Sequence, residues 1–129
     1  MNRRHIRGET TVQVVLMVPV ILLLLLVGVH VASYMHASNV ANSAAKRGAQ
    51  VAAGMSNFAE ASSAATTTVN EMVRELGSRL HGIPQVSVSG AFATVSVQVR
   101  IGRLLPFLPD TVSKRGIARR EIFMTEGQR

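Results

Sequence analysis

The strongest constraint on this chain is an apolar run near its N-terminus. None of the sixteen residues from Val14 to Val29 has a polar side chain, and thirteen of them are Val, Ile or Leu. An amphipathic helix of a soluble domain has a polar face, and this run has none. Extended over residues 12–32 it has 21 residues, and a helix needs about 20 to cross a bilayer. We therefore predict a membrane-spanning helix, whose candidate packing positions are Val14, Leu16, Pro19, Leu22, Leu23, Leu26 and Gly28.

The charges around this run predict its orientation. Arg3, Arg4 and Arg7 precede it, and the next basic residue, Lys46, follows well after its end. Cytoplasmic flanks of membrane helices carry an excess of Lys and Arg. We therefore expect the N-terminus in the cytoplasm and the rest of the chain outside it. The alternative is a secretory signal peptide cleaved near Ala32, although such peptides usually have only about 7–15 apolar residues.

The helix is predicted to continue beyond the membrane. Residues 31–53 are rich in Ala, the strongest helix former, and their apolar positions at helical spacing are all small, namely Val40, Ala44, Gly48 and Val51. Small side chains allow another helix to approach closely. One helix is therefore expected from Thr10 to Ala53, with its membrane part over residues 12–32 and a projecting stalk beyond.

A second, amphipathic helix is predicted after Gly54. Ser56 is a suitable N-cap, and the apolar side chains then follow one helical stripe, namely Val69, Met72, Val73, Leu76 and Leu80. Glu75 and Arg79 lie off this stripe at the spacing of a favourable i,i+4 ion pair. The helix is expected to end near His81, because a proline follows shortly.

An antiparallel sheet is predicted next. Apolar and polar residues alternate over residues 93–101, which indicates a half-buried strand. A two-residue turn at residues 90–91 would set Val88 opposite Ala93, with the next inward pair two residues further along each strand. A third strand is expected over residues 116–124.

The segment at residues 102–110 is apolar and contains two prolines. We expect it to cover the sheet, and the alternatives are contact with the membrane surface or with a partner. A helix packed on a small antiparallel sheet is the natural arrangement. The predicted fold class is therefore an α+β membrane protein with a long N-terminal transmembrane and stalk helix, a second amphipathic helix and a small antiparallel β-sheet.

The net charge of +7 does not indicate nucleic-acid binding once the charges are located. Residues 1–8 contribute +3, residues 9–99 contribute 0 and residues 100–129 contribute +4, so no recognition helix carries a basic stripe. The C-terminal share contains a candidate patch for partner contact, made of Lys114, Arg115, Arg119 and Arg120. The alternative for this patch is a solvated strand face.

The sequence has no catalytic or metal-binding pattern. Cysteine is absent, which excludes disulfides, thiol catalysis and Cys-based zinc sites. The four histidines share no metal-ligand spacing, and we expect each to be a polar surface or interfacial residue. The sequence therefore predicts a protein that is not an enzyme and that has no cofactor and no nucleic-acid partner.

The order of features at the N-terminus resembles that of a known family. Arg7 and Gly8 are followed, after four residues, by Gln13 and then by the apolar run with its early proline, VVLMVPVILLLLLVGV. This pattern resembles the TadE-like family of bacterial pilus-assembly pseudopilins, and the segment RGIARREIF near the C-terminus looks like that family's closing segment. The resemblance implies cleavage after Gly8 by a prepilin peptidase, with Glu9 as the new N-terminus. Gln13 stands where most relatives have Glu.

The resemblance implies a non-enzymatic minor pseudopilin-like subunit of a bacterial Tad-type pilus assembly or secretion system. Its parts would be a basic leader over residues 1–8, a transmembrane and stalk helix over residues 9–53, and an extracytoplasmic domain over residues 54–129. Its partners would be membrane lipid, other pilin-like subunits, the pilus assembly machinery and a prepilin peptidase. It would lie in the bacterial cell membrane with a single span, or in a pilus. The alternatives are an unprocessed membrane-anchored binding protein, a secreted domain with a signal peptide, and a holin-like membrane protein.

Overall fold

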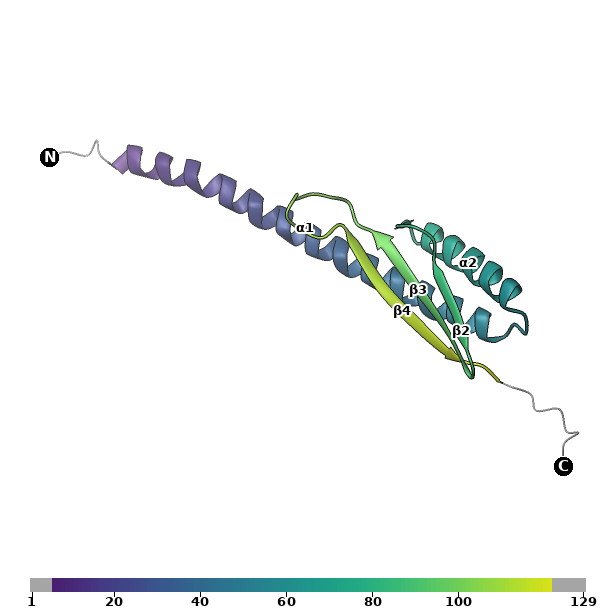
Figure 1. Cartoon of the computed structure of the whole chain (residues 1–129). Coiled ribbons are helices and arrows are strands. Elements are labelled where there is room, and N and C mark those ends of the chain that lie inside the picture. Colours follow the sequence, from purple (N-terminus) through teal and green to yellow (C-terminus); the bar gives the residue numbers. More distant parts are fainter. Residues whose placement is uncertain (1–5, 122–129) are drawn as a thin grey trace, which may run out of the picture. The chain divides into compact units, whose positions relative to one another are not determined.

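The computed structural model describes the backbone of residues 6–121 and the side chains of residues 10–121. These residues fall into two compact units, one ending at Ser33 and the other beginning at Tyr34. The elements in chain order are α1 (Ile6–Ala53), α2 (Phe58–Glu75), β1 (Arg79–Leu80), β2 (Gln85–Ser89), β3 (Phe92–Arg100) and β4 (Thr111–Arg119) (Figure 1). The predicted α+β fold class, with a long N-terminal apolar helix, a second helix and a small antiparallel sheet, is confirmed.

The first unit is helical throughout, and all its described residues belong to α1. Pro19 lies inside this helix. Its ring allows a helical φ angle, but it has no N–H to donate to the carbonyl one turn earlier. The helix is nevertheless continuous from Ile6 to Ala53, as the uninterrupted run of helix-compatible residues predicts.

The part of α1 from Tyr34 onward lies in the core of the second unit rather than projecting as a free stalk. Its buried apolar side chains are nearly all alanine, namely Ala37, Val40, Ala41, Ala44, Ala45, Ala49 and Ala52. A Cβ atom added to Gly48 would lie 2.7 Å from Val69 Cγ2 and 3.3 Å from Val95 Cγ1. Small residues thus allow α1 to approach both α2 and β3 closely. The spacing of these residues in the sequence predicts the close approach of another helix, and β3 is an additional neighbour.

The N-terminus of α2 is capped one residue later than predicted. Asn57, not Ser56, is the N-cap, and its Oδ1 accepts a hydrogen bond from the backbone N–H of Ala59 at 2.9 Å. An Asn side chain is among the strongest N-caps because it satisfies a donor that has no partner within the helix.

The C-terminus of α2 comes earlier than the predicted end near His81. Gly77 has a φ of +72°, and its N–H donates to the carbonyl of Arg74 at 3.0 Å, while the N–H of Ser78 donates to that of Val73 at 2.9 Å. These two bonds make up the Schellman motif that closes many helices. Arg79 therefore lies in β1, and the expected helical pair of Glu75 and Arg79 is wrong.

The central strand of the sheet is β3. Since β4 pairs with β3 over its whole length, β1 and β2 share the other edge, and all pairs are antiparallel. The predicted hairpin register is confirmed, with Val88 opposite Ala93 and Val86 opposite Val95. In the β2–β3 turn, the first central residue, Gly90, has a φ of +53°, and the second, Ala91, does not have a positive φ. This is the pattern of a type II′ turn.

The third strand differs from its prediction. β4 begins at Thr111, five residues before the expected start at Gly116, and the expected end at Met124 lies outside the described residues. Gly116 lies within the strand, where a Cβ atom would collide with the backbone of Ala45 in α1. A glycine that resembles a strand boundary in the sequence is therefore the point where strand and helix come closest.

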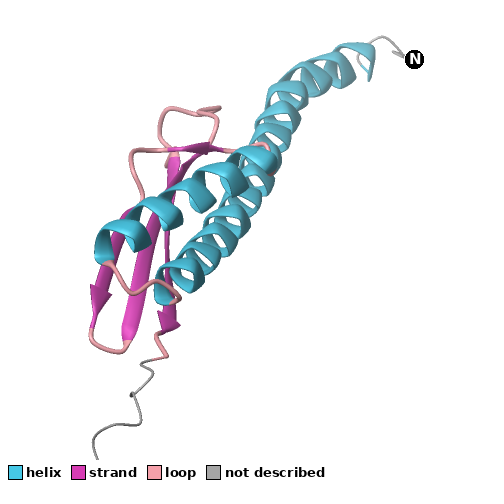
Figure 2. Cartoon of the chain, turned by 90° about the vertical axis from the view of Figure 1, so that its right-hand side faces the viewer, coloured by secondary structure: helices cyan, strands magenta, loops and turns pink. Residues whose placement is uncertain are grey.

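The second unit has two layers, because residues from both helices cover one face of the sheet (Figure 2). The inward side chains of β3 and α2 are fully or almost fully buried, namely Ala93, Val95, Val97 and Val99, and Ala61, Ala65, Val69 and Val73. The outward positions of β3 are polar at Thr94, Ser96 and Gln98. This alternation is typical of an antiparallel sheet with one covered and one solvated face.

The expected role of residues 102–110 as a cover for the sheet is wrong for two of its large apolar side chains. Leu104 is 45% exposed and Phe107 is 73% exposed. The segment is nonetheless held at its base, where the N–H of Ile101 donates to the carbonyl of Asp110 at 2.7 Å.

Candidate functional site

The apolar face of the first unit is its main candidate site. Every residue from Val14 to Val29 is exposed, including all seven predicted packing positions. Among the described residues, one helix is long and apolar enough to cross a membrane, and only 6% of its most apolar 18-residue window is buried. Water solvates so much aliphatic surface poorly, so this surface is suited to lipid or to neighbouring apolar helices.

The predicted processing residues lie at the start of the same helix. Gly8 and Glu9 are helical in backbone, and the side chains of Arg7 and Glu9 are outside the described part. Arg3 and Arg4 lie wholly outside the described residues. Gln13 is exposed on α1, one turn after Glu9.

The predicted basic patch is divided between two faces of β4. Because side chains alternate along a strand, Lys114 and Arg120 lie on the side of the buried Gly116 and are half-buried, whereas Arg115 and Arg119 are exposed. The Nη2 atom of Arg120 donates to the carbonyl of Met55 at 3.0 Å. The structure thus joins Arg120 to the α1–α2 connection and leaves Arg115 and Arg119 facing solvent.

A pocket of about 570 Å³ lies beside this contact. Its lining comes from the end of α1 with the α1–α2 connection, Gln50 and Ala53–Ser56, and from the end of β4 with the two residues after it, Ala118–Glu121. Sequence reasoning missed it, because only the fold brings residues 50–56 and 118–121 together. Its lining includes Arg119, Arg120 and Glu121, so the pocket carries both signs of charge.

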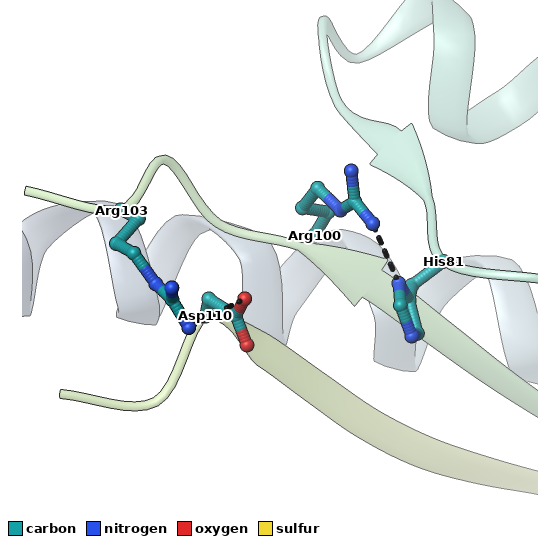
Figure 3. A network of polar contacts seen from close by, with 4 residues as sticks. All are labelled: His81, Arg100, Arg103 and Asp110. Atoms are coloured by element: carbon teal, nitrogen blue, oxygen red, sulfur yellow. Dashed lines mark hydrogen bonds and ion pairs between the residues drawn. The ribbon is translucent and has the colours of Figure 1, made fainter. Parts of the chain in front are cut away.

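A polar cluster lies where β1, β3 and β4 meet the segment 101–110 (Figure 3). Arg100 Nη2 and His81 Nδ1 are 3.1 Å apart, with the guanidinium as donor. Arg103 Nη2 lies 3.6 Å from Asp110 Oδ2, and the two side chains are 63% and 42% exposed. Such a surface ion pair contributes about 0–1 kcal/mol, so this cluster orders the base of the segment more than it stabilises the fold.

The histidines differ in their surroundings. His36 Nε2 lies 3.3 Å from the carbonyl of Leu76, whereas His30 is only 4% exposed and neither ring nitrogen has a hydrogen-bond partner in the described part of the chain. Of the two expected positions, a surface residue is therefore wrong for His30, and a place at the outer edge of the membrane stays a prediction. No three His, Asp or Glu side chains among the described residues gather as metal ligands would.

The fold and its exposed apolar segment define the class of this chain, an α+β protein with one candidate membrane-spanning helix among its described residues. Residues 8–50 match the family model described as TadE-like protein. The match covers one third of the 129 residues, and it supports the resemblance to the TadE-like family seen in the sequence. The family is associated with the Tad pilus and is generally structural rather than enzymatic. No curated protein and no solved structure gives a significant match.

Proposed function

We propose that this chain is a non-enzymatic, membrane-held minor pseudopilin-like subunit of a bacterial Tad-type pilus assembly or secretion system. The observation that carries the proposal is the exposed apolar surface of Val14–Val29, which lies inside the family match over residues 8–50. That surface holds the subunit in the bilayer before assembly. It then packs against the apolar helices of other pilin-like subunits.

Topology follows from the flanking charges. The arginines at positions 3, 4 and 7 keep the N-terminus in the cytoplasm, and the unit from Tyr34 onward is extracytoplasmic. The leader at residues 1–8 ends at a cleavage site for a prepilin peptidase, between Gly8 and Glu9. That protease performs the chemistry, and this chain is its substrate.

The absence of cysteine makes the topology directly testable. In the Gly8→Leu background, in which the leader is expected to be retained, Asn2→Cys and Ser63→Cys place single thiols in the leader and on the exposed part of α2. In intact cells whose outer envelope has been permeabilised, an impermeant maleimide is expected to label the Ser63→Cys chain and to spare the Asn2→Cys chain until the inner membrane is lysed. Labelling of both, or of neither, before lysis would contradict a single span with this orientation.

The mature N-terminus tests processing. Mass spectrometry of the membrane fraction is expected to find a chain that begins at Glu9, and Gly8→Leu is expected to leave the full leader. Gly28→Ala is the matched control, because a Cβ atom there meets nothing within 4 Å. A start at Met1 in the unmodified chain would instead support the unprocessed membrane anchor.

Gln13 is the specific observation that favours this second candidate. Most members of the family that this chain resembles have Glu at this position. An ionisable residue beside an apolar segment is costly and usually functional, and Gln13 can hydrogen-bond but carries no charge. If Gln13 impairs assembly, Gln13→Glu increases the amount of this chain found in purified pili. If the chain acts only as an anchor, the substitution changes nothing.

A further inference from the structure

The segment between β3 and β4 exposes large apolar side chains on an ordered base. Leu104 and Phe107 are 45% and 73% exposed. The loop closes through the Ile101–Asp110 backbone bond at 2.7 Å and a second bond from the N–H of Leu108 to the carbonyl of Leu105 at 3.3 Å. The fold thus presents these apolar groups on a fixed support, although burying them would gain hydrophobic free energy.

The position of this loop within the second unit follows from the contacts of β4. Gly116 lies against Ala45, and Ala118 lines a pocket together with Ala53. Following β4 back toward Thr111 therefore follows α1 back toward Tyr34. The loop leaves the sheet at the Tyr34 end of this unit, opposite the β2–β3 turn (Figure 1). Tyr34 is where the chain arrives from the apolar segment.

Basic side chains flank the loop at the same end of the sheet. Arg79 and Arg100 are paired in register, Arg103 follows within the loop, and all three are exposed. Asp110 is the one acidic residue of residues 100–111, and it is paired with Arg103. Exposed apolar groups beside arginines match a bilayer surface, whose acyl boundary accepts the former and whose anionic headgroups attract the latter.

We propose that the Ile101–Asp110 loop docks on the lipid headgroup surface of the membrane that holds the apolar helix. Phe107 and Leu104 enter the boundary between headgroups and acyl chains, and Arg100 and Arg103 contact lipid phosphates. The loop is thus a second attachment of the subunit to the bilayer. This inference rests on the proposed membrane anchoring.

The chain contains no tryptophan, so single-tryptophan variants report on one position each. Phe107→Trp probes the loop, and Leu23→Trp probes the apolar segment. The matched control is Phe58→Trp, because Phe58 is 57% exposed and lies at the N-terminus of α2. Each full-length variant is reconstituted in vesicles of phosphatidylcholine and phosphatidylglycerol, with and without bromine on the acyl chains, after circular dichroism has confirmed its fold.

The expected result is blue-shifted emission and quenching by brominated lipid for Phe107→Trp and Leu23→Trp, with neither effect for Phe58→Trp. Quenching of Leu23→Trp alone would overturn the loop proposal and leave the membrane anchor standing. Absence of quenching for Leu23→Trp would overturn the anchor and the loop proposal together. A blue shift of Phe107→Trp that grows with the ratio of protein to lipid, without quenching by bromine, would show a protein partner and overturn the lipid surface.

The charge of the lipid tests the arginines. Omitting phosphatidylglycerol is expected to reduce the quenching of Phe107→Trp, and adding Arg100→Gln and Arg103→Gln to that variant is expected to remove this dependence. Arg115→Gln, on the exposed face of β4, is the control and is expected to retain it. Equal quenching with and without phosphatidylglycerol in the unmodified background would overturn the phosphate contacts.

Discussion

Gly116→Ala tests the closest approach between the sheet and α1. The added methyl group would collide with the carbonyl group of Ala45 and with the backbone nitrogen of Lys46. Neither can rotate away as a side chain can, so the strand and the helix must separate. Overpacking a core typically costs about 1–3 kcal/mol, and a backbone obstacle places this case at the upper end of that range.

A compensating gain must be subtracted from this cost. Glycine in a strand is about 0.5–1 kcal/mol less favourable than alanine, so the net loss for Gly116→Ala is about 2 kcal/mol. For a domain of up to about 100 residues, 1 kcal/mol changes Tm by roughly 4–8 °C. The expected fall in Tm is therefore roughly 8–16 °C.

The assay is thermal unfolding of the full chain in detergent micelles, followed by far-ultraviolet circular dichroism. Gly102→Ala is the matched control, because a Cβ atom there meets nothing within 4 Å, and it is expected to change stability by less than about 0.5 kcal/mol. Ala45→Gly in the Gly116→Ala background is expected to restore nothing, since the obstacle is backbone. Equal Tm values for Gly116→Ala and Gly102→Ala would refute the close approach.

Three further substitutions test local features of the second unit. Asn57→Ala is expected to lower the free energy of unfolding by about 1 kcal/mol, whereas Ser56→Ala leaves it unchanged in urea titrations; the reverse order would restore Ser56 as the cap. Gly77→Ala forces a left-handed backbone on a residue with a Cβ atom and is expected to cost about 1–2 kcal/mol, with Gly77→Asn costing less. Gly48→Ala is expected to cost about 1–3 kcal/mol by overpacking and to gain about 1 kcal/mol in helix propensity. The free energy of unfolding is therefore expected to fall by about 1 kcal/mol, and adding Val69→Ala should remove the overpacking cost.

Local signals predict the helices and the hairpin well. The alternation of residues 93–101 and the turn at Gly90 determine strand, turn type and register together, because a shift by one residue would turn Val88 and Ala93 to solvent. The end of α2 was harder to predict, because Leu80 continues the helical stripe of Val69 and Val73 while lying in a strand. Gly77 closes the helix before that stripe ends.

Features that depend on distant contacts could not be predicted from the sequence. β4 has poor alternation because Gly116 takes an inward position to admit the backbone of α1. The basic residues near the C-terminus form one group in the sequence, yet alternation divides Lys114 from Arg115. The partners of Arg120 and Arg100 lie 65 and 19 residues away, and only the folded chain brings them together.

β4 also forms an outer edge of the described sheet, since its one strand partner there is β3. An uncovered edge invites pairing with the same edge of another copy. In the proposed membrane-held state, subunits would diffuse in two dimensions and collide frequently. Lys114, Arg115 and Arg119 would bring like charges together in such a pairing, so mutual repulsion is expected to keep stored subunits from aggregating through their sheets while their helices remain free to assemble.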